Sequence, residues 1–192
     1  MNVRPVFAAA ECGGTGEIGL NYAAIKYCDI ANGTGVRTSL FVSGCTHRCK
    51  GCFNAVAWDF NYGDPFGEEE ENRILASLAP EYINGLSLLG GEPFEPQNQP
   101  ALLQLCRKVR AEFPEKTIWC YTGYLMEEIL AGRVGERQTA LELLRCLDIL
   151  VDGEFVEEKK NIRLKFRGSE NQRIICVPQT LQQGRIVLWE ER

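Results

Sequence analysis

Short apolar runs alternate along the chain with longer segments whose apolar residues recur every three or four positions. The runs at 39–43, 85–93, 117–124 and 147–155 have the length of buried strands. The segments predicted as helices lie between them, at 68–78, 98–113, 124–133 and 137–147. Strands that alternate with helices in this way predict a parallel sheet with helical connections.

The carboxyl ends of these four strands fall at Cys45, Gly90, Thr122 and Asp152. In β/α proteins such ends open on one face, where functional sites lie. A complete eight-unit barrel needs about 200 to 250 residues or more, and this chain has 192. We therefore predict an α/β fold, an incomplete and laterally open (β/α) barrel of about five or six strands.

The two ends of the chain are less regular than its middle. Residues 1–20 are small and glycine-rich without periodicity, and we expect a poorly ordered lead before a single domain at 21–192. Residues 21–30 can form a strand, followed by a turn at Asn32. Near the other end, 172–177 and 185–190 are strand-like and predict a final hairpin or edge strands.

Net charge, the length of apolar runs and the number of cysteines exclude some classes of protein. The formal net charge is -5, so no basic face for nucleic acid is expected. No apolar run approaches the length of about 18 residues that a membrane span requires, and residues 1–14 contain no long apolar stretch of a secretory leader. Nine cysteines in such a chain indicate the reducing cytoplasm.

Three of these cysteines, Cys45, Cys49 and Cys52, follow the strand at 39–43 in a C-x3-C-x2-C spacing. Neighbouring thiolates repel one another unless a positive centre holds them, so a metal is expected. Structural zinc needs four closed ligands, whereas a 4Fe-4S cluster takes one thiolate per iron. Three cysteines leave one iron open, as a catalytic centre requires, and His47 lies too close to Cys45 for unstrained closure around zinc.

The other cysteines are scattered along the chain. We expect Cys106, Cys120, Cys146 and Cys176 to be small buried hydrophobic residues, because they lie within apolar strand or helix patterns. Cys12 and Cys28 belong to no such pattern.

The strand at 85–93 ends in a second distinctive sequence, Gly90, Gly91, Glu92 and Pro93. Two glycines allow the backbone to approach a ligand without interference from Cβ atoms. Glu92 adds a carboxylate beside that backbone. Alone, this sequence is an ordinary loop; after a three-cysteine loop it becomes a candidate binding site.

The cysteine loop, with Phe53 directly after its third cysteine, resembles the signature of the radical S-adenosylmethionine (SAM) enzymes. The longer segment SGCTHRCKGCFNAVAW is similar to the corresponding sequence of activating enzymes that install a glycyl radical. Further matches in chain order are GLSLLGGEPFEPQN, IWCYTGY, LDILVDGEF and FRGSENQR. Together they resemble the activating proteins of anaerobic ribonucleoside-triphosphate reductase.

This resemblance implies a radical SAM barrel and a specific chemistry. Cys45, Cys49 and Cys52 would bind three irons of a 4Fe-4S cluster, and SAM would chelate the fourth. The residues from Gly90 to Pro93 would hold the amino group of the SAM methionine. Reductive cleavage would give a 5′-deoxyadenosyl radical that takes hydrogen from a backbone glycine of the reductase. The low potential implies an external donor, flavodoxin or ferredoxin.

Two other interpretations are open at this point. Another radical SAM enzyme, acting on a different glycyl-radical enzyme or on a small molecule, would share the cysteine loop and the Gly-Gly-Glu-Pro sequence. It would lack the TGY, LVDGEF and RGSENQR segments. A zinc-binding interaction module without catalysis is the alternative from a different class, and metal analysis would separate it at once, because zinc gives a colourless protein without labile sulfide.

Two roles are possible for each of several polar residues. Thr122 and Asp152 would bind polar groups of SAM or a cation, or else cap their strands. Arg37 would contact SAM or the partner, although a solvent-exposed arginine after a turn is the expectation we favour. The polar segment 167–173 would order the site or the partner's loop.

The ligand assignment predicts a contrast between two cysteine variants. Cys45→Ala should abolish cluster assembly and SAM cleavage together, because it removes one of three iron ligands. Cys146→Ala should leave both intact. Iron and sulfide content with 5′-deoxyadenosine assays would measure this, and loss of the cluster in the Cys146 variant would overturn the assignment.

Overall fold

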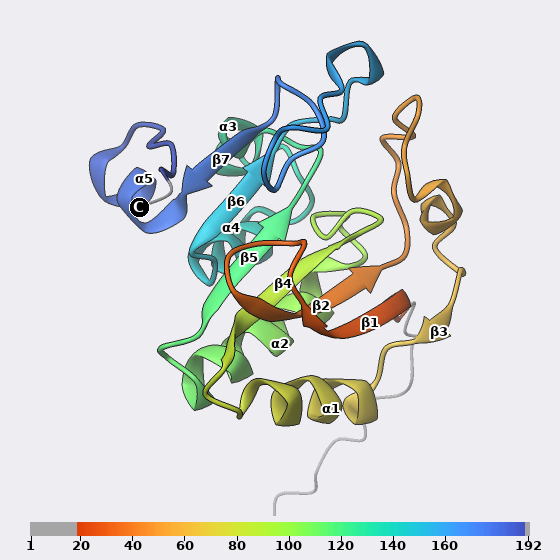
Figure 1. Ribbon diagram of the computed structural model, residues 1–192, viewed down its shortest axis with the longest axis vertical. Helices are drawn as coiled ribbons and strands as arrows, with labels where there is room; N and C mark the ends of the chain where they lie inside the picture. Colours follow the sequence, from red (N-terminus) through yellow and green to blue (C-terminus); the bar gives the residue numbers. More distant parts are fainter. Residues whose placement is uncertain (1–18, 191–192) are drawn as a thin grey trace, which may run out of the picture.

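The computed structural model describes residues 19–190, in which seven strands form one open sheet. The spatial order is β3-β1-β2-β4-β5-β6-β7 (Figure 1). The strands are β1 (Asn21–Asp29), β2 (Val36–Val42), β3 (Asp64–Pro65), β4 (Ile83–Gly90), β5 (Thr117–Tyr121), β6 (Ile149–Asp152) and β7 (Arg173–Cys176). The expected lead falls mostly outside the described residues, but Leu20 is buried in the core and its carbonyl accepts a hydrogen bond from Phe66.

The central strands β2, β4, β5 and β6 are parallel to one another, whereas β1, β3 and β7 pair antiparallel outside them. This confirms the predicted α/β class and the open sheet, and the antiparallel strands make the sheet mixed. The carboxyl ends of the four parallel strands therefore lie at one edge. The sheet has seven strands where about five or six were expected, and the two-residue β3 is too short to show a strand pattern.

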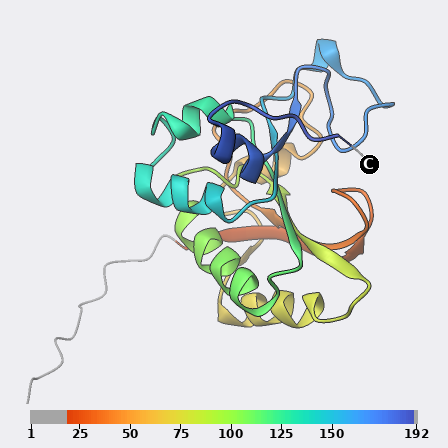
Figure 2. The ribbon, with the colours of Figure 1, turned by 90° about the vertical axis from the view of Figure 1, so that its left-hand side faces the viewer.

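Helices connect the parallel strands and lie mainly on one side of the sheet (Figure 2). They are α1 (Glu68–Leu78), α2 (Gln99–Glu112), α3 (Met126–Leu130), α4 (Arg137–Arg145) and α5 (Val177–Gln183), with short 3-10 turns η1 (Ala55–Trp58) and η2 (Glu157–Lys159). None of the helices in residues 19–190 has the length and apolar character needed to cross a bilayer.

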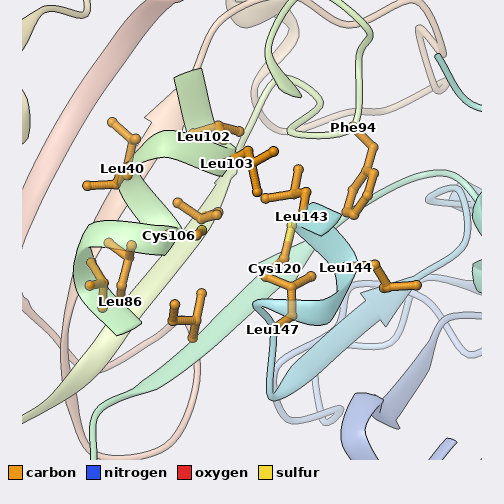
Figure 3. Close-up of a cluster of buried hydrophobic side chains, with 14 of the residues drawn as sticks. Leu40, Leu86, Phe94, Leu102, Leu103, Cys106, Cys120, Leu143, Leu144 and Leu147 are labelled. Atoms are coloured by element: carbon orange, nitrogen blue, oxygen red, sulfur yellow. The ribbon is translucent and has the colours of Figure 1, made fainter. Parts of the chain in front are cut away.

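The main hydrophobic core lies between the sheet and α1, α2 and α4 (Figure 3). Alternation along the strands directs Leu86 of β4 and Cys120 of β5 into it, where they meet Cys106 of α2. Cys106 and Cys120 are fully buried, as predicted, whereas Cys146 and Cys176 are only partly buried. Burial raises the pKa of the Cys120 thiol well above its usual value, so it remains an apolar packing group.

The opposite face of the sheet contains a buried arginine, and the expectation that Arg37 is exposed is wrong. Its guanidinium donates to the hydroxyls of Ser87 and Thr117, at 2.7 and 2.9 Å, and to the carbonyls of Leu86 and Thr117, at 2.7 and 2.8 Å. The group lies 5.6 Å from the centroid of the Trp119 ring. Burial lowers the pKa of Arg37 to about 10, which still leaves it charged at neutral pH.

The C-terminal part differs from the predicted hairpin. β7 is an antiparallel edge strand beside β6, as expected, but residues 185–190 contribute only an isolated bridge from Leu188 to Ile175. Between them the chain forms α5, with Pro178 in its first turn and Gly184 ending it at φ 65°. Proline in the first turn and a left-handed glycine after the last favour a helix over a hairpin turn.

Replacing Arg37 should test how much the fold depends on this buried cation. Arg37→Met would leave several buried acceptors unpaired, and we expect unfolding free energy to fall by about 3 kcal/mol. The matched variant Arg73→Met removes an exposed arginine that pairs with Glu69 and Glu70, and its unfolding free energy should stay close to that of the wild type. Urea unfolding measures both, and equal losses would contradict the account.

Candidate functional site

The cysteine loop, residues 44–53, leaves the carboxyl end of β2 and is held at its base by backbone hydrogen bonds. The amide of Gly44 donates to the carbonyl of Ala57, and the amide of Cys45 donates to the carbonyl of Trp58. Gly44 has a φ of 92°, and a Cβ there would overlap the ring of Phe60. Only glycine fits this exit from the strand.

The residues that follow β4 are hydrogen-bonded directly to the base of the cysteine loop. The amide of Gly91 donates to Val42, and the amide of Glu92 donates to Gly44 at 2.8 Å. A Cβ at Gly91 would lie 2.4 Å from the carbonyl oxygen of Gly44, so the two backbones approach closely. Gly44 and Glu92 are 48 residues apart in the chain, and the two sequence motifs are therefore in contact through their backbones.

A cavity of about 460 Å³ opens at this edge of the sheet. Its wall includes the three motif cysteines, the strand end after β4 and the strand end after β5. The predicted site residues that line it are Cys45, Cys49, Cys52, Gly90, Gly91, Glu92 and Thr122. Pro93 is buried behind the wall, and Asp152 does not line the cavity.

The three cysteines are free thiols, each partly buried. Burial, with the nearby Glu92 carboxylate next in importance, raises the pKa of Cys45 to about 11. The pKa of Cys49 is also raised by burial, while a hydrogen bond from the Phe155 amide opposes the shift. A cation at this position would have to displace the Cys45 proton, because the thiolate is the metal ligand.

Glu92 is almost completely buried and both of its carboxylate oxygens have partners. One accepts from the amide of Phe94 at 2.8 Å and from the hydroxyl of Thr122 at 2.7 Å. The other accepts from the amide of Gly123 at 2.7 Å. The side chain thus links the end of β4 to the end of β5, and Glu92 is one of the residues that line the cavity.

His47, which lies too close to Cys45 for unstrained closure around zinc, connects the cysteine loop to two carboxylates. Its Nδ1 lies 2.9 Å from Glu154, and its Nε2 lies 3.3 Å from Glu92, an ion-pair distance without hydrogen-bond geometry. Burial would lower the pKa of His47, but Glu92 and Glu154 outweigh it and raise the pKa to about 9. The imidazole also packs on Tyr124 with centroids 4.4 Å apart.

Thr122 and Asp152 have different surroundings. Besides donating to Glu92, the Thr122 hydroxyl accepts from the amide of Tyr124. Asp152 is fully buried, accepts from the amide of Met126 at 2.9 Å and is ion-paired with Arg173. These contacts are those expected of a strand-end residue, and a role of Asp152 in cofactor binding stays a prediction.

The polar segment 167–173 shapes the loop that follows β6. Gln172 accepts from the amides of Gly168 and Ser169 and donates to the carbonyl of Gly153. Asn171 donates to the carbonyl of Glu154. The segment therefore holds the cavity wall that faces the cysteine loop, where Arg167 and Gln172 line the cavity.

Sequence reasoning missed Glu95 and Tyr121. Glu95 is buried and accepts from both the amide and the hydroxyl of Thr46 at 2.6 Å, so it orders the cysteine loop. Tyr121 lines the cavity, and burial raises the pKa of its phenol. Its position two residues after Trp119 on β5 places both rings on the same face, which the strand period alone could have indicated.

The donor set suits an iron–sulfur cluster better than one ion. No three His, Cys, Asp or Glu side chains in residues 19–190 are placed to enclose a single metal ion. A cluster takes one thiolate per iron, so its cysteines need not converge on one point. Three free thiols on one glycine-bounded loop, facing a cavity beside a second exposed strand end, fit that requirement.

Comparison with known proteins agrees with this donor set. A family model described as a 4Fe-4S single cluster domain matches residues 31–175, which places the chain among proteins with that domain. Over 146 residues the chain is 44% identical to the anaerobic ribonucleoside-triphosphate reductase-activating protein of Salmonella typhi, covering 75% of this chain and 90% of that protein.

Two further relatives carry the same name. The Escherichia coli (strain K12) protein is 42% identical over 155 residues, which cover 80% of this chain and 96% of that protein. The Enterobacteria phage T4 protein is 40% identical over 157 residues, covering 81% and 93%. The chain belongs to the family of anaerobic ribonucleoside-triphosphate reductase-activating proteins.

The contact between Thr122 and Glu92 can be tested with two hydroxyl variants. Thr122→Val removes a donor to a buried carboxylate, and unfolding free energy should fall by about 2 kcal/mol, with less iron retained per chain. Thr122→Ser keeps the hydroxyl and should lose only about 1 kcal/mol for one methyl group. Urea unfolding and iron analysis distinguish them. A valine variant as stable as the wild type would show that this contact does not hold the site.

Proposed function

We propose that the protein is a radical SAM activase that installs a glycyl radical on anaerobic ribonucleoside-triphosphate reductase in the cytoplasm. One observation carries the proposal. The three free cysteines of one loop and the Gly90–Glu92 strand end face the same cavity of about 460 Å³, at the carboxyl edge of four parallel strands. The relatives named for this activation support the choice of substrate.

The proposed cofactors are a 4Fe-4S cluster and SAM. Cys45, Cys49 and Cys52 would hold three irons, and the backbone from Gly90 to Glu92 would receive the methionine end of SAM. When bound, the reduced cluster and SAM supply a 5′-deoxyadenosyl radical. The protein's own contribution is binding, orientation and exclusion of competing reactions.

The surrounding residues position this apparatus. Glu92 and Thr122 fix the two strand ends relative to one another, and Glu95 fixes the start of the cysteine loop through Thr46. We assign Glu92 this positioning role through its side chain and a binding role through its backbone. Asp152 acts at a distance, by holding Arg173 and the start of α3.

The open sheet suits a macromolecular substrate. Helices lie mainly on one face of the open sheet (Figure 2), and this arrangement supports a partial (β/α) barrel whose inner side would remain accessible. A loop of the reductase that carries the target glycine could enter the cavity from this side. A glycine is a suitable target, since two flanking amides delocalise its radical and no side chain blocks approach.

The test is anaerobic reconstitution with iron and sulfide, followed by reduction and addition of SAM with and without the reductase. We expect 5′-deoxyadenosine and an electron paramagnetic resonance signal of a glycyl radical on the reductase. The reductase with its target glycine replaced by alanine is the matched control and should give no such signal.

Three other results of this experiment would each favour a different conclusion about the protein. Deoxyadenosine without a radical on the reductase would keep the cofactor chemistry and assign a different substrate, another glycyl-radical enzyme or a small molecule. Neither product from a cluster-loaded protein would refute the activase. Bound zinc in place of iron and sulfide, after anaerobic isolation, would favour the interaction module.

A further inference from the structure

A basic segment borders the cavity of this acidic protein. Residues 159–167, here called the basic rim, contain five cationic residues and no acidic one, although the whole chain has a net charge of -5. The cations are Lys159, Lys160, Arg163, Lys165 and Arg167. Within residues 19–190, the exposed side chains of Lys159, Lys160 and Arg163 make no ion pair or hydrogen bond. Their charge is therefore available to a partner.

The acidic residues that precede the rim are already engaged by the cysteine loop. Lys50 lies 3.1 Å from Glu157 and 3.4 Å from Glu158, and His47 pairs with Glu154. These pairs join the two loops and use the acidic side chains that lie nearest before Lys159, Lys160 and Arg163 in the sequence. Farther along, Glu170 accepts a hydrogen bond from Asn161 at 3.0 Å.

The rim lies next to the cysteines. Lys160, Ile162 and Arg167 line the same cavity as Cys45, Cys49 and Cys52. Figure 1 shows that the segment after β6 and the cysteine loop after β2 rise from the same end of the sheet. A protein bound to the rim would therefore lie close to the thiols of the three motif cysteines.

The rim has a defined shape before any partner binds. The backbones of Lys160 and Ser169 form an isolated antiparallel β-bridge, and the amide of Asn161 donates to the carbonyl of Gly168. Phe166 packs against Trp119 with centroids 5.3 Å apart. Between these anchors, Ile162 projects with 91% of its surface exposed. A preformed surface loses little conformational entropy on binding.

We propose that the basic rim is the docking surface for an acidic electron-transfer protein that reduces the cluster. This inference rests on the proposed function, which requires one electron from outside. A reduced low-potential flavin or iron–sulfur protein would lose one electron, and the cluster would gain it, with no bond or proton transferred. The chemistry identifies the donor by its acidic surface and its low potential.

The character of the rim favours a redox donor over the reductase as its occupant. Weak electron-transfer encounters have small interfaces, and charge complementarity accelerates association more than it strengthens a complex. In the rim, the exposed cations Lys159, Lys160 and Arg163 accompany one highly exposed apolar side chain, Ile162. A surface of that kind suits a partner that must bind quickly, deliver an electron and leave.

The test uses charge reversal away from the cavity wall. Lys159→Glu combined with Arg163→Glu changes two rim residues that do not line the cavity. Arg133→Glu combined with Arg137→Glu makes the same change in net charge at exposed positions of the helical layer. Flavodoxin is the probe, with binding measured at low and high salt and cluster reduction followed by its visible absorbance.

The rim variant should bind flavodoxin at least about tenfold more weakly at low salt and be reduced correspondingly more slowly. Its salt dependence should also be shallower. The control variant should match the wild type in both assays. Reduction by dithionite, which needs no docking, should give wild-type SAM cleavage in every variant.

Unchanged flavodoxin binding in the rim variant would overturn the proposal. Loss of reductase binding with unchanged flavodoxin binding would assign the rim to the reductase instead, and would also overturn it. Failure of the proposed function looks different, because dithionite-reduced wild-type protein would then cleave no SAM, whereas flavodoxin binding would still depend on the rim.

Discussion

The buried carboxylate of Glu92 is the contact on which the geometry of the site depends. It accepts hydrogen bonds from Thr122 and from the amide of Gly123, and it lies 3.3 Å from His47 of the cysteine loop. Its backbone amide donates to Gly44. One residue therefore fixes the relative positions of β4, β5 and the loop that follows β2. A buried carboxylate is costly unless its partners are in place, so these contacts are mutually dependent.

The same carboxylate gives the site its electrostatic character. Glu92 and Glu95 lie beside the cysteine loop, and together with burial they raise the pKa of Cys45. Thiolates are therefore unfavourable there without a compensating positive centre. An iron–sulfur cluster would supply that charge, and residues 31–175 of the chain match a 4Fe-4S single cluster domain. The local fold, the electrostatics and the family agree on the kind of centre expected.

Much of the fold was predictable because it follows from local periodicity. Apolar runs ending at Cys45, Gly90 and Thr122, separated by helical segments, imply parallel strands whose ends meet. The contact between the cysteine loop and the Gly-Gly-Glu-Pro sequence follows from that topology. The radical SAM chemistry came from resemblance, since no periodicity specifies a cofactor. β3 and α5 were missed, because two residues show no period and α5 depends on Pro178 and Gly184 at its ends.

The remaining differences concern side chains whose partners are distant in the sequence. Arg37 follows a turn and reads as exposed, but its acceptors lie 50 and 80 residues away. His47 lies in a loop, as its sequence position suggests, but its partner Glu154 lies 107 residues away. Asp152 lies at a strand end, and its partner Arg173 follows 21 residues later. Burial and pairing of this kind arise only when the whole sheet has formed.

Mössbauer spectroscopy of protein reconstituted with 57Fe, with and without SAM, tests the central claim most directly. Three irons bound by Cys45, Cys49 and Cys52 and a fourth open to SAM predict that SAM changes the signal of one iron in four. Four irons that do not respond to SAM, in a protein with a full cluster, would contradict the assignment of an open iron beside Gly90–Glu92.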